Sequence, residues 1–299
     1  MTTLIDAQAN LRTLRDVLRY AVSRFNEAQL SFGHGQPDAF DEAAFIVMRT
    51  LKLPLERLEF FADAYLTHAE IHELLQLIDR RIKKRLPAAY LLNEAWLRGY
   101  KFYVDERALI PRSFIGELLD EGLDPWIPDR NAVNDVLDMC TGSGCLAIMA
   151  ADLFPKAKVD AADASADALQ VARRNIADYQ LEQRVTPVKS DLFGALGNKR
   201  YDLIVCNPPY VTEAAMSALP PEYQHEPKLA LAGGADGMNL VKTLVRQARG
   251  HLKRGGLLIV EVGDGRAAAE KAFNDLPLTW LTTSAGDDMV FLARQEELP

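Results

Sequence analysis

The sequence predicts an α/β protein in which a mostly parallel sheet follows a small all-helical N-terminal domain. Three features predict it. Up to about residue 88, apolar residues recur only at helical spacing. From Val133 on, short apolar runs alternate with amphipathic stretches, the pattern of a parallel sheet covered by helices. A glycine-rich loop at 140–144 then follows the first apolar run and opens a helix, as in Rossmann-like domains.

Size and composition indicate an ordinary globular chain. Its 299 residues exceed the usual length of one domain, so we expect two. The net charge of −8 argues against duplex binding and would suit a basic protein partner, although an acidic balance is common among soluble enzymes. No apolar run reaches the ~18 residues of a membrane span, and the three cysteines lack metal-site spacing. We expect a cytoplasmic protein without a metal, membrane contact or direct DNA binding.

Residues 1–88 are expected to form the helical domain. Apolar spacings predict helices over 5–29, 41–51, 55–61 and 67–85, and Thr67 with Glu70 fits a capping box at the start of the last one. That helix ends in a basic run, Arg-Arg-Ile-Lys-Lys-Arg at 80–85. Such a run is usually a solvated helix face, and contact with RNA or with an acidic partner stays open as the alternative.

Residues 89–112 are expected to be a β-hairpin linker. Strands over 97–104 and 107–110 would flank a turn at Asp105-Glu106. Arg112, at the end of this segment, could reach a carboxylate or a backbone oxygen, or form a linker salt bridge.

The sheet domain is expected to span 113–299. Its predicted strands are 133–139, 158–162, 185–189, 201–206 and 256–263, with 279–283 and 289–293 closing the sheet. Ligands of such sheets bind at the carboxyl ends of the strands. Gly142 and Gly144 would allow close approach there, and Asp163, about 20 residues on, is spaced to accept hydrogen bonds from ribose hydroxyls. On this loop alone, a dehydrogenase is an alternative.

The stretch Asn207-Pro208-Pro209-Tyr210 follows a buried strand abruptly. The prolines have no N–H to donate and a fixed φ, so the carbonyls beside them are free acceptors. Asn207 adds a side-chain oxygen and Tyr210 an aromatic face. Together they suit a planar nitrogen that carries two hydrogens, although the same residues could simply end a strand in a turn.

These motifs together resemble the S-adenosylmethionine-dependent methyltransferases that modify amide or exocyclic amino nitrogens, and most closely the glutamine N-methyltransferases. Beyond the helical N-terminal domain, the resemblance rests on FYVDERALIPRS at 102–113, LDMCTGSGCLAI at 137–148, DLIVCNPPYV from 202 and HEPKLALAGGADG at 225–237. Cys140, where the release-factor branch has glycine, and Ser113-Phe114-Ile115-Gly116-Glu117 favour the branch that modifies the third protein of the large ribosomal subunit.

The resemblance implies a class I methyltransferase domain that uses S-adenosylmethionine, with the helical domain recognising the substrate. It implies cofactor contacts from Asp138, Cys140, Thr141, Gly142, Ser143, Gly144, Asp163, Asp191, Leu192 and Asn207, with Asp163 at the ribose and Asp191 and Leu192 at the adenine. It places the substrate glutamine at Asn207, Pro208, Pro209 and Tyr210.

We expect the Asn207 oxygen and the Pro208 carbonyl to orient the glutamine amide, while Tyr210 packs on its plane. The partner would be the third large-subunit protein, before or during ribosome assembly. The alternatives are a release-factor glutamine methyltransferase, an adenine-amino DNA methyltransferase and a ribosome-assembly factor that acts without catalysis.

Overall fold

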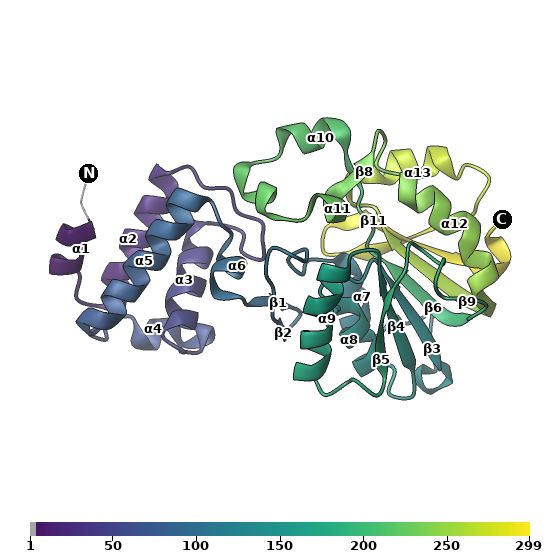
Figure 1. The fold of residues 1–299 in the computed structure, drawn as a ribbon, viewed down its shortest axis with the longest axis horizontal. Coiled ribbons are helices and arrows are strands. Elements are labelled where there is room, and N and C mark those ends of the chain that lie inside the picture. Colours follow the sequence, from purple (N-terminus) through teal and green to yellow (C-terminus); the bar gives the residue numbers. More distant parts are fainter. Residues whose placement is uncertain (1–3) are drawn as a thin grey trace. The chain divides into compact units, whose positions relative to one another are not determined.

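The computed structural model describes residues 4–299, so residues 1–3 of the predicted helical domain lie outside the described part. The described chain divides into two compact units (Figure 1). The helical unit contains the chain up to Glu94 together with 220–225, and the sheet unit contains Ala95–Leu219 and Glu226–Pro299. The chain therefore leaves the sheet unit after Leu219, contributes one short segment to the helical unit and returns.

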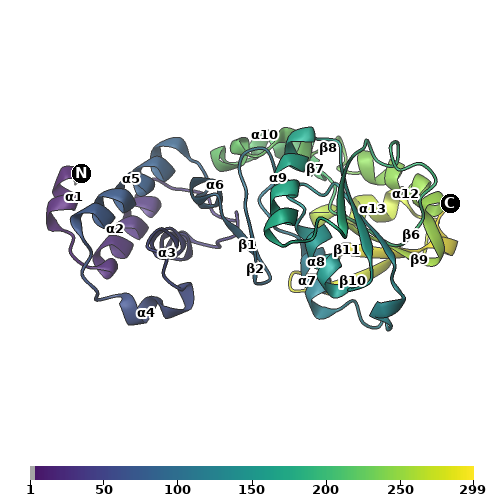
Figure 2. The same ribbon diagram turned by 60° about the horizontal axis from the view of Figure 1, so that its bottom comes forward.

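The helical unit is built around three helices that contact one another, α2, α3 and α5 (Figure 2). Its helices are α1 (Leu4–Asn10), α2 (Leu14–Glu27), α3 (Ala39–Thr50), α4 (Leu58–Phe61), α5 (His68–Lys84) and α6 (Ala88–Leu92). Their apolar faces bury Leu14, Phe25, Ile46 and Leu74 almost completely. The capping box predicted at the start of α5 is confirmed, because the Thr67 side chain accepts the Glu70 N–H and Glu70 accepts the Thr67 N–H.

The predicted helix over 5–29 is wrong, because the chain breaks between α1 and α2. Thr13 is the N-cap of α2: its hydroxyl accepts the Asp16 N–H at 3.2 Å, and the Asp16 carboxylate accepts the Thr13 N–H at 2.9 Å. This reciprocal pair satisfies two backbone donors at a helix start. Leu11 and Leu14 keep helical spacing across the break, which hid the capping box in the sequence.

The basic run at the end of α5 is only partly a solvated face. Arg81 is fully buried, with its Nε 2.5 Å from Oε1 of Glu42 and its Nη1 3.3 Å from Oε1 of Glu222. Arg85 also reaches Glu222, at 3.0 Å. These two cations hold the 220–225 segment within the helical unit, while the other three basic residues of the run are exposed.

The predicted hairpin exists, but its strands and turn lie elsewhere. Strands β1 (Ala95–Leu97) and β2 (Tyr100–Phe102) pair antiparallel around Arg98-Gly99, whose φ values are +49° and +84°. Positive φ at both central residues is the geometry of tight hairpin turns. The predictions of strands over 97–104 and 107–110 are therefore wrong, because the turn falls inside the first of them.

The sheet unit contains a seven-stranded sheet in the order β10-β11-β9-β6-β3-β4-β5. Its parallel strands are β3 (Asp135–Met139), β4 (Lys158–Asp163), β5 (Val185–Lys189), β6 (Tyr201–Cys206) and β9 (Leu252–Glu261). Strands β10 (Thr279–Thr283) and β11 (Gly286–Arg294) close one edge antiparallel. This confirms the predicted α/β fold.

Helices cover both faces of this sheet (Figures 1 and 2). One face packs under α7 (Phe114–Glu121), α8 (Cys145–Leu153) and α9 (Ala166–Asp178), and the other under α12 (Asn239–His251) and α13 (Arg266–Ala272). Leu203 and Val205 of β6 belong to the first core, and Ile204 belongs to the second. Burial on both faces explains why the strands read as continuous apolar runs.

A further two-stranded sheet follows the Asn-Pro-Pro-Tyr stretch and was not predicted. Strand β7 (Val211–Thr212) pairs parallel with β8 (Ala232–Gly234), and the short helices α10 (Glu213–Ala218) and α11 (Lys228–Leu231) lie between them in sequence. The pairing brings the Gly233-Gly234 pair beside the residues that follow Tyr210. Among residues 4–299, no helix combines the length and the apolar character needed to cross a membrane.

Candidate functional site

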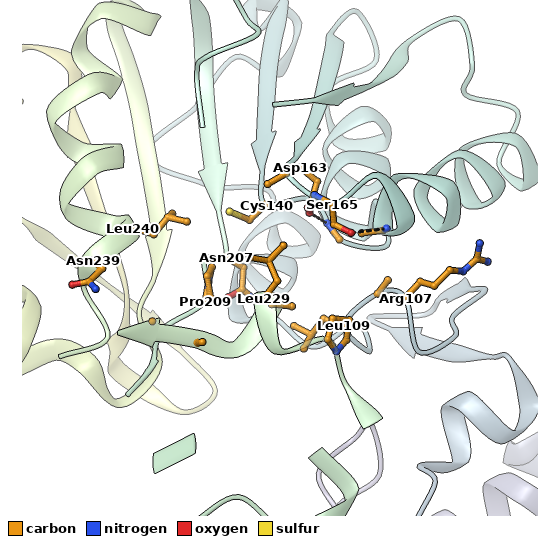
Figure 3. A pocket seen from close by; sticks show the side chains of 18 of the residues that line it. Arg107, Leu109, Cys140, Asp163, Ser165, Asn207, Pro209, Leu229, Asn239 and Leu240 are labelled. Atoms are coloured by element: carbon orange, nitrogen blue, oxygen red, sulfur yellow. Dashed lines mark hydrogen bonds between the residues drawn. The ribbon is translucent and has the colours of Figure 1, made fainter. Parts of the chain in front are cut away.

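A cavity of about 400 Å³ lies in the sheet unit, at the carboxyl ends of β3, β4 and β6 (Figure 3). It is lined by Cys140 and Gly142 after β3, by Asp163 at the end of β4, and by Asn207 and Pro209 after β6. Its remaining walls include Leu109, Leu229, Gly233, Gly234, Asn239 and Leu240. Its size is typical of a small-molecule site, and its place is the edge where the ligands of parallel sheets bind.

The glycine loop presents its backbone to this cavity. Gly142 has φ +56°, and a Cβ added there would meet no atom within 4 Å, so the space beside it is open. Its N–H donates to the Asp163 carboxylate at 2.9 Å, which ties the loop to the end of β4. Cys140 adopts φ +62°, a conformation that glycine takes without strain.

The other predicted loop residues do not line the cavity. Asp138 is 1% exposed, and its Oδ2 accepts the Thr141 hydroxyl at 2.5 Å and the Ala147 N–H at 3.0 Å. Burial raises the pKa of Asp138 to about 7. The Ser143 carbonyl accepts Asn175 Nδ2 at 2.9 Å, and Gly144 caps α8 with φ +82°. These contacts fix the shape of the loop.

Asp163 is the acid that faces the cavity. One carboxylate oxygen accepts the Gly142 N–H, and the other accepts the Ser165 N–H at 2.8 Å, so its orientation is fixed while lone pairs remain for a ligand. Burial raises its pKa. Asp191 and Leu192 follow β5, at the same edge of the sheet, but neither of them lines the cavity.

Asn207 is held by its nitrogen. Its Nδ2 donates to the main-chain oxygen of Arg112 at 3.3 Å, and within residues 4–299 no hydrogen bond is made to its Oδ1. Pro209 lines the cavity beside it, as Figure 3 shows, whereas Pro208 is buried outside the lining. The side-chain oxygen of Asn207 is therefore available to a ligand donor.

Tyr210 does not line the cavity, and its hydroxyl is held by a buried acid. The hydroxyl donates to Oε1 of Glu261 at 3.2 Å. Glu261 is 2% exposed, and its Oε2 also accepts the Ser113 hydroxyl at 2.6 Å and the Phe114 N–H at 2.9 Å. Burial raises the pKa of both Tyr210 and Glu261. The sequence analysis did not identify Glu261 as a site residue. Its place at the end of an apolar strand, at the edge where the site lies, could have identified it.

Three glycines leave no room around Tyr210. A Cβ added to Gly233 would come within 2.7 Å of the Tyr210 Cα, and one added to Gly237 within 2.4 Å of its carbonyl oxygen. A Cβ at Gly263 would lie 2.6 Å from the ring carbon Cε2. Real Cβ atoms do not approach so closely, so these positions fix both the backbone and the ring of Tyr210.

Sequence comparison relates this chain to known proteins. Residues 118–219 match the methyltransferase small domain family. A Burkholderia pseudomallei protein named ribosomal protein uL3 glutamine methyltransferase is 54% identical over 295 residues, covering 96% of each chain. A Neisseria gonorrhoeae protein of the same name is 52% identical over 292 residues, covering 98% of this chain and 97% of its own.

One solved structure supports the fold independently of close sequence similarity. The catalytic domain of hMettl16, determined in complex with the MAT2A 3'UTR hairpin 1, matches 75% of this chain and 79% of its own. The sequence identity is 15% and the TM-score is 0.50. At this identity the match concerns the fold alone.

Proposed function

Because the chain belongs to the family of ribosomal protein uL3 glutamine methyltransferases, as its motifs predicted, we propose that it methylates the side-chain amide nitrogen of a glutamine in uL3. It is an S-adenosylmethionine-dependent methyltransferase. The observation that carries the proposal for this site is the Asn207 side chain, whose nitrogen is anchored while its oxygen is left to the cavity.

The cavity residues fit the cofactor. Open space beside Gly142 lets a ligand approach the backbone, and the fixed carboxylate of Asp163 suits ribose hydroxyls. Cys140 and Gly142 would contact the methionine part, with Asp138, Thr141, Ser143 and Gly144 supporting the loop. Asp191 and Leu192 would lie toward the adenine. When bound, S-adenosylmethionine supplies an electrophilic methyl group that needs no further activation.

The task of the protein is therefore to orient a poor nucleophile. The lone pair of an amide nitrogen is delocalised into its carbonyl, and attack requires it to face the methyl carbon. The Asn207 oxygen and the Pro208 carbonyl would accept the two amide hydrogens, and Pro209 would wall the cavity beside them. Their dipoles also stabilise the positive charge that grows on the nitrogen.

Tyr210 would provide the plane on which the amide packs. Its hydroxyl is held by Glu261 and its backbone by the surrounding glycines, so its ring has a fixed position. No strong base is required, because the methylated nitrogen is acidic enough to release its proton to water.

The wider setting is also part of the proposal. The helical unit would recognise uL3, and the modification would occur in the cytoplasm, before or during assembly of the large subunit. The net charge of −8 suits a basic partner protein. The relatives disfavour the release-factor enzyme, the DNA methyltransferase and the dehydrogenase as alternatives.

The test is to incubate the protein with methyl-labelled cofactor and separated ribosomal proteins, release factors or adenine-containing DNA. We expect label in uL3, and fragmentation of the labelled protein should locate the methyl group on a glutamine side chain. Label on a release factor, on DNA or on another uL3 side chain would contradict the proposal. The matched control omits uL3 from the protein mixture.

A further inference from the structure

An ion pair between Arg112 and the buried Glu226 supports the anchor of Asn207. Both terminal nitrogens of Arg112 meet the Glu226 carboxylate, Nη1 to Oε1 at 2.5 Å and Nη2 to Oε2 at 2.6 Å. The Ile110 N–H donates to the same carboxylate at 3.2 Å. The Glu226 side chain is completely buried. The Ile110 backbone and the Arg112 side chain are thus tied to one carboxylate, and the main-chain oxygen of Arg112 is the one that accepts Asn207 Nδ2.

This oxygen determines which end of the Asn207 amide faces the cavity. The terminal torsion of asparagine is broad and roughly two-fold, so the amide can turn over and exchange its oxygen and nitrogen. A carbonyl can only accept, so the nitrogen must face Arg112 and the oxygen must face away. With the amide reversed, an N–H donor would point at the N–H groups of the substrate amide and could not hold them.

We propose that Glu226 is a positioning residue for methyl transfer, which acts through Arg112 on the orientation of Asn207. This inference rests on the proposed function. A bidentate guanidinium–carboxylate pair is strongly directional, so it fixes the 110–112 backbone more narrowly than a single contact would. Arg112, at the end of the linker, thereby helps to position the active site. Its side chain contacts a carboxylate, which was one of the alternatives that the sequence left open for it.

The competing explanation is that Glu226 only packs its loop against the 110–112 segment. Both explanations predict some loss of stability when the pair is broken. They differ in whether Asn207 is needed for the effect on catalysis, because a residue that acts through another has no effect on the rate once that other is removed.

The experiment is a double-mutant cycle with Glu226→Gln and Asn207→Ala. Glu226→Gln keeps the volume and one acceptor oxygen but turns an N–H₂ group toward Arg112, so the bidentate pair is lost. Single-turnover methylation of uL3, cofactor affinity and the melting temperature are measured for all four proteins. We expect Glu226→Gln to lower the rate by about 10- to 100-fold, since a shift of ~1 Å can cost that much, with cofactor affinity unchanged.

In the Asn207→Ala background, Glu226→Gln should lower the rate by less than about two-fold. In the wild-type background the same substitution should lower it by about 10-fold or more, the scale of one lost interaction. Glu117→Gln is the matched control: Glu117 holds Ser284 by two hydrogen bonds, at 2.6 and 2.7 Å, and lines no part of the cavity. It should leave the rate unchanged.

An equal loss in both backgrounds, or no loss in either, would overturn the role of Glu226 while leaving the proposed function intact. A wild-type rate for Asn207→Ala alone would instead refute the assigned role of Asn207, and the inference with it. If Glu226→Gln lowers the melting temperature without changing the rate, Glu226 is structural only.

Discussion

Gly263→Ala should displace the Tyr210 ring, and the structure sets the size of the effect. The new methyl group would lie 2.6 Å from Cε2 and 3.1 Å from Cδ2 and Cζ of the ring. Ordinary carbon contacts lie at about 3.5–4.0 Å, so the ring must move by roughly 1 Å. That movement would stretch the 3.2 Å hydrogen bond to Glu261, whose net worth is about 0.5–1.5 kcal/mol.

The φ of Gly263, +52°, adds a strain of about 1–2 kcal/mol for any residue with a Cβ. Gly197→Ala isolates this strain: Gly197 has a similar φ, +59°, and an added Cβ there would meet nothing within 4 Å. Both variants should therefore lose stability, and Gly263→Ala should lose more because of the clash.

The assay is single-turnover methylation of uL3, alongside cofactor titration and thermal unfolding. A shift of ~1 Å in a group that positions the substrate can cost about 100-fold in rate, so Gly263→Ala should lose about that much and Gly197→Ala should lose little. Equal rates for the two variants would refute the claim that the fixed ring of Tyr210 holds the substrate amide.

Three further outcomes are expected. Asp163→Ala should weaken S-adenosylmethionine binding by about 10- to 100-fold, as expected when hydrogen bonds to a charged group are lost, and unchanged affinity by calorimetry would contradict its assignment. Arg81→Met should destabilise the protein by about 3–5 kcal/mol, because the Glu42 carboxylate 2.5 Å away stays buried without its partner, whereas Arg80→Met at an exposed position should have little effect on thermal unfolding. The pKa of Asp138 is about 7 in the folded protein, against an ordinary value of 3.8. Between these two pH values the folded protein therefore binds a proton that the unfolded chain does not. The contribution of Asp138 to stability falls as the pH rises from 3.8 to about 7. From pH 5 to about pH 8, the melting temperature of the wild type should therefore fall relative to that of Asp138→Asn. A constant difference between the two would contradict the raised pKa.

The strands of the main sheet could be predicted because burial on both faces forces long apolar runs. DLIVC at 202–206 and GLLIVE at 256–261 carry that pattern without interruption, and both are strands. The carboxyl ends of these strands then define one edge, so the loop at 140–144, Asp163 and Asn207 could be expected to meet there. Cys140 and Gly142 of that loop do line one cavity together with Asp163 and Asn207.

The errors arise where a local pattern continued across a real boundary. Helical spacing ran through Leu11 and Leu14, so the break at Thr13 was overlooked. Apolar residues on both sides of Arg98-Gly99 read as one strand, although a glycine between two such runs is an ordinary hairpin feature.

The contacts that complete the site could not be derived from one sequence. Arg112 and Glu226 are 114 positions apart, and Tyr210 and Glu261 are 51 apart. In each pair the two residues are polar or charged, and their separation along the chain gives no sign that they are partners. Arg81 looked like any member of a basic run, and only its burial against Glu42 and Glu222 gives it a structural role.

The most direct measurement of the central claim compares wild type with Asn207→Ala in two readings, the affinity for S-adenosylmethionine and the single-turnover rate of uL3 methylation. If the amide oxygen orients the glutamine, the variant should bind the cofactor with nearly wild-type affinity and lose about 100- to 1,000-fold in rate, the scale of one removed oxyanion-type or dipolar contact. A wild-type rate, or a loss explained entirely by weaker cofactor binding, would contradict it.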